Sequence, residues 1–460
     1  MKRLILSIAA VALCFGAYAQ AIGPEELKEI QDSYVLDAST RAIRNVLVND
    51  KNIKSHVLDN DVASAIDHEF KYKVNVSGIT DQLSSGRCWM FTSMNVLRPS
   101  VMKQFYLKEF DFSHSYCFFW DLFEKANLFL ENVIATAGKD ITDRDVWTYF
   151  KSPISDGGVW NLFWDIAEKY GVVPASVMPE TQHSNNTSQM DAVLNEYLRS
   201  AGWNLRQAID SGTRKKVVRE MKISALKDVY RILALCMGVP PTEFTWKYKD
   251  KEGNVKTLTS TPKEFYKSIV PADYHPDTYI MIMNDPTREY YKTYEIASYR
   301  NTYEGINWVY LNLPNEEIKP AALASIKAGT PMYVSCDVGK QSLTASGKGV
   351  MDPGLFDYES LFGVSMKMDK KARILTHQSG SSHAMTLIAC DTDENDVPVK
   401  WEFENSWGAS AGNRGYLTFT DKWFDEYLFR IVIEKKYLSK KAADAVGTKP
   451  IVVPVWDYMF

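Results

Sequence analysis

The fold is decided by the stretch Asp81-Gln82-Leu83-Ser84-Ser85-Gly86-Arg87-Cys88-Trp89-Met90-Phe91. In this stretch a cysteine stands directly before an aromatic-rich run that predicts a helix, and a Ser/Gly loop that predicts a turn precedes it. A thiol at a helix N-terminus meets the positive end of the helix dipole and unpaired N–H groups, which both favour the thiolate. Because an isolated cysteine is more often a small buried hydrophobic residue, partners elsewhere in the chain must decide whether it is a nucleophile.

Two apolar helices are predicted around this loop. The run after Cys88 places apolar residues at helical spacing, so we expect a helix that buries one stripe and ends before Pro99. A second apolar helix is expected over residues 113–131. His114 and Cys117 stand there among aromatic residues and are expected to be packed rather than catalytic.

A Gly-rich turn at residues 155–158 precedes a helix predicted from Trp160 to Tyr170, with Gly171 as its C-cap. The turn lacks the glycine spacing of a phosphate-binding loop. We therefore expect Gly157 and Gly158 to form a flat backbone surface beside an extended ligand, and we assign them to substrate binding.

The C-terminal part of the chain turns to strand patterns. Residues 383–390 and 399–405 alternate in hydropathy, and the Asp-, Glu- and Asn-rich segment between them predicts a hairpin. Side chains two residues apart share one face of a strand. Neighbouring strands would therefore present the imidazole of His383 and the amide of Asn405 side by side.

A nucleophilic site is predicted from Cys88, His383 and Asn405. A cysteine nucleophile needs a base that holds it as thiolate and later protonates the leaving amine, and that base needs a partner that fixes its tautomer. His377 competes for the role of base, but it lies in a loop outside the alternating strand, so we favour His383.

Two further residues complete the predicted site. We assign the side-chain amide of Gln82, together with the backbone N–H of Cys88, to the stabilisation of the developing oxyanion. Trp407 is assigned to the substrate-binding surface, where it would also shield the hydrogen bond between His383 and Asn405 from water. An aromatic residue that is simply part of the core explains Trp407 equally well.

The composition excludes several functional classes. Of 460 residues, 45% are hydrophobic and 24% charged, as in soluble globular proteins, and the net charge of -4 provides no basic surface for nucleic acid. The cysteines after Cys14 are odd in number and widely spaced, which argues against a disulfide framework. No Cys/His spacing suits zinc, so we expect neither a metal nor a cofactor. These later cysteines are Cys88, Cys117, Cys236, Cys336 and Cys390.

The N-terminus has the pattern of a secretory signal. Lys2-Arg3 precede an apolar run from Leu4 to Ala17, and Ala17-Tyr18-Ala19 has the form of a cleavage site. We expect residues 1–19 to be a signal peptide and the protein to be exported to the periplasm or outside the cell, without stable membrane association. A lipid anchor at Cys14 is disfavoured because the preceding residue is not small, and an uncleaved anchor is disfavoured because the run is short for a membrane span.

The motifs resemble those of a known family. Four segments are similar to signature blocks of papain-like cysteine peptidases: Gln82, Gly86-Arg87-Cys88-Trp89, His383-Ala384 and Asn405-Ser406-Trp407-Gly408. Four more resemble the bleomycin hydrolase and aminopeptidase C branch: residues 84–89, 168–174, 336–340 and 455–457. Cys88 and His383 lie about twice as far apart as the roughly 130 to 150 residues usual in papain-type enzymes, which fits an insertion in the middle of the chain.

The resemblance implies an α+β papain-like fold, with a helical lobe and a β lobe around a cleft, a large mainly helical insertion and a C-terminal arm. The expected segments are a signal peptide over 1–19, an N-terminal extension and helical lobe over 20–178, the insertion over 179–300, the β lobe over 301–449 and the arm over 450–460. It also implies peptide substrates, homohexamers and removal of N-terminal residues from peptides by use of the arm.

Two departures from the family pattern bear on function. Export is unlike most of the family, and the arm ends at Trp456-Asp457-Tyr458-Met459-Phe460, where relatives continue further. About three missing residues would leave the terminal carboxylate roughly 10 Å short of a substrate's amino group. We expect an aminopeptidase acting on short peptides; the alternatives left open are an endopeptidase, a catalytically idle peptide-binding protein, and a thiol acyltransferase or amide hydrolase that uses the same residues.

Overall fold

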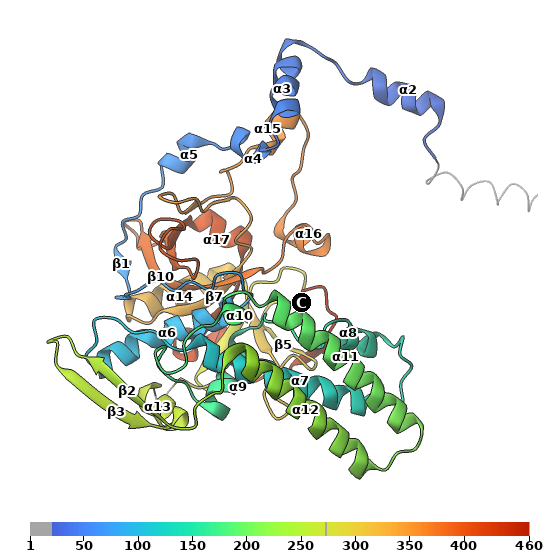
Figure 1. Ribbon diagram of the computed structural model, residues 1–460. Coiled ribbons are helices and arrows are strands. Elements are labelled where there is room, and N and C mark those ends of the chain that lie inside the picture. The colour runs from blue at the N-terminus through green and yellow to red at the C-terminus, as the bar shows by residue number, and fades with distance from the viewer. Residues whose placement is uncertain (1–20, 272–273, 460) are drawn as a thin grey trace, which may run out of the picture. The chain divides into compact units, whose positions relative to one another are not determined.

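The computed structural model describes residues 21–271 and 274–459 (Figure 1). The described chain forms two compact units, of which the smaller comprises residues 21–58 together with Phe356–Ser365. In the smaller unit Asp37 caps α3 by accepting a hydrogen bond from the backbone N–H of Thr40. The helices of this unit are α2 (Pro24–Asp32), α3 (Ala38–Asn49), α4 (Ile53–His56) and α15 (Tyr358–Phe362).

A helical layer makes up one part of the larger unit. Helix α6 (Cys88–Gln104) is buried along most of its length and packs against α7 and α9 on one side and against the sheet on the other. Its apolar side chains join a core of aromatic and aliphatic residues from α7, α9, α11 and α12. The other helices here are α7 (His114–Ala135), α8 (Arg144–Lys151), α9 (Trp160–Tyr170), α10 (Gln182–Asn185), α11 (Ser188–Asp210), α12 (Lys215–Met237) and α13 (Pro262–Ile269). A short helix outside this layer, α5 (Asn60–Ser64), precedes β1 in the chain.

Helix α6 corrects one expectation, because it does not end before Pro99 but continues through it to Gln104. Proline inside a helix removes one backbone hydrogen bond and crowds the carbonyl four residues earlier. Leu97 and Val101, on either side of Pro99, are both buried in the core. Burial of this face offsets the cost of the proline, and local propensity is overridden by tertiary packing.

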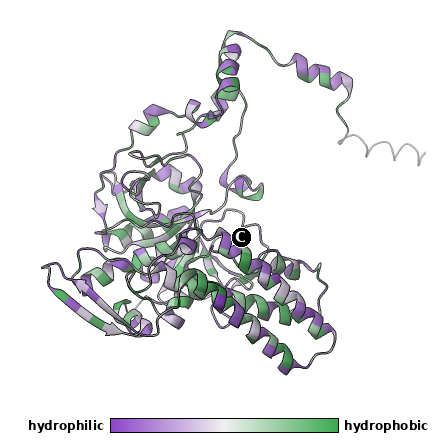
Figure 2. Cartoon of the chain, viewed as in Figure 1, coloured by the Kyte–Doolittle hydropathy of each residue, from purple (hydrophilic) through white to green (hydrophobic). Residues whose placement is uncertain are grey.

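The middle of the chain contains both helices and strands. Helices α11 and α12 pack against each other and onto α7, and both carry hydrophilic as well as hydrophobic residues along their length (Figure 2). The hairpin of β2 (Phe244–Lys249) and β3 (Val255–Ser260) follows them. Helix α13 begins with a capping box between Thr261 and Glu264.

A large mixed sheet forms the other part of the larger unit. Its strands run in the order β14-β5-β6-β4-β13-β7-β10-β11-β12-β9-β8, and β1 pairs with β10. β4 and β5 precede residue 300 but belong to this sheet. The strands are β1 (Tyr72–Lys73), β4 (Tyr279–Met283), β5 (Lys292–Ile296), β6 (Val309–Asn312), β7 (Met332–Cys336), β8 (Ser342–Leu343), β9 (Val350–Met351), β10 (His383–Thr392), β11 (Pro398–Glu404), β12 (Tyr416–Thr420), β13 (Leu428–Glu434) and β14 (Ile451–Val453).

The hairpin predicted near the C-terminus is confirmed: β10 and β11 pair antiparallel, with Leu387 opposite Phe403. On its other side β10 pairs with β7, where His383 lies opposite Cys336. A second apolar core covers this part of the sheet. Its helices are α14 (Asn315–Lys327), α17 (Asp421–Tyr427) and α18 (Lys440–Val446), with a 3-10 turn at Lys435–Tyr437. Helix α16 (Lys370–Leu375) instead contributes Ile374 to the first core.

The expected signal peptide lies outside the described residues. Within residues 21–271 and 274–459, no helix has the length and apolar character needed to cross a membrane. The division of the chain into five segments stays a prediction.

Candidate active site

The N-terminus of α6 is held in place by the loop before it. Arg87 takes the N-cap position, and its fully buried guanidinium forms an ion pair with Glu180 at 2.9 Å. The backbone N–H of Gln82 donates to the carbonyl of Ser406 at 2.9 Å, which ties the loop to the residues after β11. Cys88 is thus the first residue of a helix whose start is fixed on two sides, as the sequence predicted.

His383 and Asn405 meet at the ends of neighbouring strands. His383 opens β10 and Asn405 follows β11, and the imidazole Nε2 lies 2.8 Å from Oδ1 of Asn405. The same Oδ1 accepts the backbone N–H of Ser406 at 2.8 Å, which fixes the orientation of the amide. With Asn405 accepting, Nε2 carries the proton and Nδ1 is left as the basic nitrogen.

Trp407 covers this hydrogen bond. Its ring stacks on His383 with centroids 4.6 Å apart and planes 29° apart. His383 is 6% exposed and Asn405 1% exposed, so their hydrogen bond is shielded from water. Trp407 itself remains half-buried and lines the adjoining cavity, a position that suits both of the roles assigned to it.

Gln82 is buried and its amide is fixed at both ends. Nε2 donates to the carbonyl of Ser85 at 2.6 Å, and Oε1 accepts from the hydroxyl of Ser406 at 2.7 Å. An amide nitrogen has two protons, so one remains for a ligand in the cavity that Gln82 lines.

One cavity of about 540 Å³ brings the predicted residues together. Asn405 lies behind His383, outside this lining, and His377 is exposed in a left-handed turn with φ 58°. Within the described residues, 21–271 and 274–459, the structure contains no hydrogen bond between Cys88 and His383. The predicted site residues in the lining are Gln82, Cys88, Gly157, Gly158, His383 and Trp407.

Burial opposes a lone charge on either of the two reacting groups. It raises the pKa of the Cys88 thiol to about 11, against which the nearby backbone N–H of Ala384 lowers it. Burial lowers the pKa of His383 to about 4, although the hydrogen bond that its ring donates to Asn405 raises it. The combination with no net charge, thiol with imidazole or thiolate with imidazolium, is therefore the stable one over a wide pH range.

Sequence reasoning missed several residues of the cavity. Arg430 on β13 and Met459 near the C-terminus both line it, and Arg430 Nη2 donates to the carbonyl of Met459 at 3.3 Å. Arg430 reaches the cavity because it lies opposite Ser335 of β7, the neighbour of β10. This pairing is long-range, and no local pattern around Arg430 indicates it.

The C-terminal segment is attached to the larger unit along its length. β14 pairs with β5, and the Asp457 carboxylate forms an ion pair with Arg288 at 2.5 Å. Arg144 stacks on the ring of Trp456 at 3.7 Å from its centroid. The segment is therefore fixed in place up to Met459, which lines the cavity.

Metal ligation has no candidate in the part of the chain that the structure describes, where no group of three or more His, Cys, Asp or Glu side chains is arranged to hold an ion.

Comparison with known proteins decides the family. The Peptidase C1-like family matches residues 21–460. The chain belongs to this family. Its Peptidase C1-like relatives include mouse (Mus musculus) bleomycin hydrolase, 38% identical over 85% of this chain and 88% of that protein. Aminopeptidase C of Lactobacillus delbrueckii subsp. lactis is 36% identical over 86% of this chain and 88% of that protein.

The fold of the Peptidase C1-like family is also confirmed by a solved structure. The crystal structure of PepW from Lactobacillus rhamnosis HN001 superimposes with a TM-score of 0.91, at 33% identity, and covers 96% of this chain and 99% of that one. The expected papain-like α+β fold is therefore confirmed, and the protein is a papain-like cysteine peptidase.

Proposed function

We propose that this peptidase is an aminopeptidase that acts on short peptides through Cys88, His383 and Asn405. The observation that carries the proposal is that Cys88 and Met459 line one cavity, so the C-terminal segment forms part of the wall beside the nucleophile. The relatives named aminopeptidase C agree with this activity.

The first half of the reaction forms a thioester. His383 takes the proton of the Cys88 thiol, and the thiolate attacks the carbonyl carbon of the scissile peptide bond. The oxyanion accepts hydrogen bonds from the side-chain amide of Gln82 and the backbone N–H of Cys88. The imidazolium then protonates the leaving amine, and the C–N bond breaks.

The second half regenerates the enzyme. His383 accepts a proton from water, the resulting hydroxide attacks the thioester, and the proton returns to the sulfur as the acid product leaves. Asn405 holds the ring in one tautomer throughout, and its neutral amide adds no charge of its own.

The C-terminal segment gives the site its preference for chain ends. Because Met459 occupies part of the cavity wall beside Cys88, the segment limits how far an extended peptide can run past the nucleophile. Two contacts hold the segment in this position: the ion pair between Arg288 and Asp457, and the hydrogen bond that the Arg430 side chain donates to the backbone carbonyl of Met459.

Product analysis on one peptide with a free and with an acetylated N-terminus tests the proposal. We expect stepwise release of N-terminal residues from the free peptide and little cleavage of the blocked one. Internal cleavage of the blocked peptide would replace the proposal with endopeptidase activity. Cys88→Ala is expected to abolish turnover while the protein stays folded, and retained turnover would refute the nucleophile.

Export and assembly are further parts of the proposal. The N-terminal sequence favours cleavage after Ala19 and export, which N-terminal sequencing of the mature protein and cell fractionation would test. The family resemblance favours a homohexamer. Native mass spectrometry should then give six times the mass of one chain, and a monomer would refute this assembly.

A further inference from the structure

The turn at Ser155–Gly158 lies against the helix that carries the nucleophile. Gly157 and Gly158 line the cavity with Cys88. A Cβ on Gly158 would lie 2.6 Å from Cε2 of Trp89, so the indole packs directly on this glycine. The indole Nε1 of Trp89 also donates to the carbonyl of Asp156 at 2.9 Å.

The side chain of Asp156 reaches the loop on the other side of Cys88. Its Oδ2 accepts the backbone N–H of Gly86 at 2.6 Å and the hydroxyl of Thr187 at 2.6 Å. A Cβ on Gly86 would lie 2.3 Å from Oδ1 of the same carboxylate, so only glycine permits this approach. Hydrogen bonds to a carboxylate are stronger than those between neutral groups.

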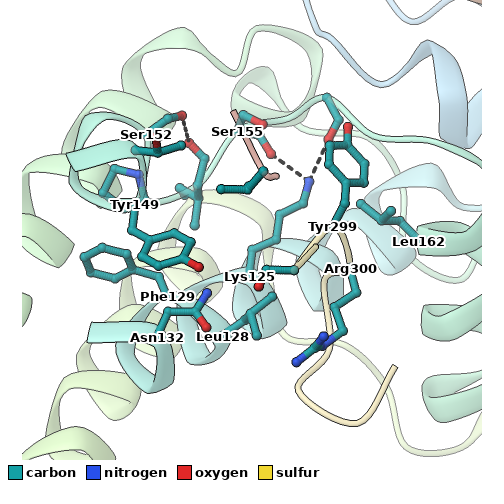
Figure 3. Close-up of a pocket in the computed structure, with 16 residues that line it drawn as sticks. Lys125, Leu128, Phe129, Asn132, Tyr149, Ser152, Ser155, Leu162, Tyr299 and Arg300 are labelled. Atoms are coloured by element: carbon teal, nitrogen blue, oxygen red, sulfur yellow. Dashed lines mark hydrogen bonds between the residues drawn. The ribbon is translucent and has the colours of Figure 1, made fainter. Parts of the chain in front are cut away.

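Lys125 holds the turn from its opposite side. Figure 3 shows its amine pointing to the turn at Ser155, and Nζ donates to the carbonyls of Ser155 and Gly157 at 2.8 Å each. Its charge is balanced by the buried carboxylate of Asp121 at 2.7 Å, which in turn accepts from Asn301 at 2.9 Å. The turn is therefore fixed between α7 and the loop before α6.

We infer that Asp156 is a positioning residue that couples the loop before the nucleophile to the Gly157–Gly158 edge on which substrate lies. The Asp156 carboxylate accepts the backbone N–H of Gly86, two residues before Cys88, and the backbone of Asp156 continues directly into Gly157. The hydrogen bond between Asp156 and Gly86 thereby sets the distance between the Cys88 sulfur and a peptide that lies along Gly157 and Gly158. The inference rests on the proposed function, because it concerns the peptide-binding edge of the same site.

The contribution of this positioning can be measured as a loss of rate. A misplacement of about 1 Å in an active site costs on the order of 100-fold in rate. We expect Asp156→Ala to lower kcat/KM by about that factor, because the Gly86 N–H loses its acceptor. Asp156→Asn retains an oxygen acceptor in the same place and is expected to recover most of the loss.

Two alkylating reagents separate positioning from thiol reactivity and from turnover. A peptidyl chloromethyl ketone must lie along the glycine edge to reach Cys88, whereas iodoacetamide need not. We expect Asp156→Ala to slow the peptidyl reagent about 100-fold relative to iodoacetamide, and Asp156→Asn to restore that ratio. The Asp156 charge raises the pKa of Cys88, so iodoacetamide labelling should begin at lower pH in both variants.

Thr187→Val and Lys125→Met serve as matched variants. Thr187→Val removes the other hydrogen bond to the same oxygen and should leave the reagent ratio close to wild type. Should Asp156→Ala fail to fold, Lys125→Met releases the turn from its other side and is expected to lower the same ratio without moving the pH at which iodoacetamide labels Cys88.

A wild-type reagent ratio in folded Asp156→Ala, or an Asp156→Asn variant as impaired as Asp156→Ala, would overturn the inference. Absence of peptide turnover in the wild-type protein, with the ratio changed as expected, would refute the proposed function and leave the coupling standing.

Discussion

Replacing Gln82 by alanine tests the oxyanion site most directly. One proton of the Gln82 amide is bound by the Ser85 carbonyl, which leaves the other for a ligand, so Gln82→Ala removes one of two proposed oxyanion donors. Loss of one such donor costs about 100- to 1,000-fold in kcat, or about 2.7 to 4 kcal/mol. We expect this loss in kcat with KM little changed, because the donor acts on the oxyanion rather than on the bound peptide.

The same substitution also affects stability. The hydroxyl of Ser406 donates to Gln82 Oε1, and both residues are buried. A buried polar group left without a partner costs about 1 to 3 kcal/mol. The free energy of unfolding of Gln82→Ala, from urea denaturation followed by fluorescence, should fall by that amount.

Ser406→Ala is the matched control. It breaks the same hydrogen bond from the other side and lowers the unfolding free energy, but it leaves the Gln82 nitrogen in place. Steady-state kinetics on one chromogenic aminoacyl substrate should therefore give a kcat close to wild type for Ser406→Ala. Equal losses of kcat in Gln82→Ala and Ser406→Ala would refute the oxyanion assignment and leave Gln82 a structural residue.

Three further changes test other parts of the site. Burial lowers the pKa of His383, whereas the hydrogen bond that its ring donates to Asn405 raises it, so the acid limb of kcat/KM should lie below pH 6.5. In Asn405→Ala this limb should move to lower pH, and a shift to higher pH would contradict the assignment. Arg288→Ala breaks the ion pair that holds the C-terminal segment, so cleavage of N-acetylated peptides should rise relative to free ones, measured by mass spectrometry of the products. Gly158→Ala places a methyl group against the Trp89 indole and should lower the unfolding free energy by about 1 to 3 kcal/mol in urea; unchanged stability would show that the indole moves aside.

Local patterns predicted the elements that carry the catalytic groups. The helix from Trp160 to Tyr170 with Gly171 after it was predicted from an apolar stripe and a glycine, and α9 has these bounds. Alternation gave the hairpin that brings His383 beside Asn405, because period two fixes which side chains share a face. These features depend on residues that are close in sequence.

The parts that were not predicted depend on distant contacts. Pro99 remains inside α6 because its neighbours are buried by helices and strands far along the chain. Arg430 enters the cavity through the pairing of β13 with β7, and Met459 through the attachment of the C-terminal segment. A sequence pattern carries no information about such pairings until the topology of the sheet is known.

The chemistry and the choice of substrate are built from separate parts of this site. In the proposed mechanism, bond cleavage depends on the stretch Gln82 to Cys88 and on the strand ends at His383 and Asn405, where burial keeps the reacting pair without net charge. Substrate access is proposed to depend on the C-terminal segment at Met459, which is held by Arg430 and not by the His383–Asn405 pair. Because the two parts line one cavity but are held by different contacts, a change in the C-terminal segment should alter which peptides are cut while the rate constant for thiol alkylation stays the same. A displaced loop before Cys88 should instead slow the cleavage of every peptide alike, because all peptides react with the same sulfur.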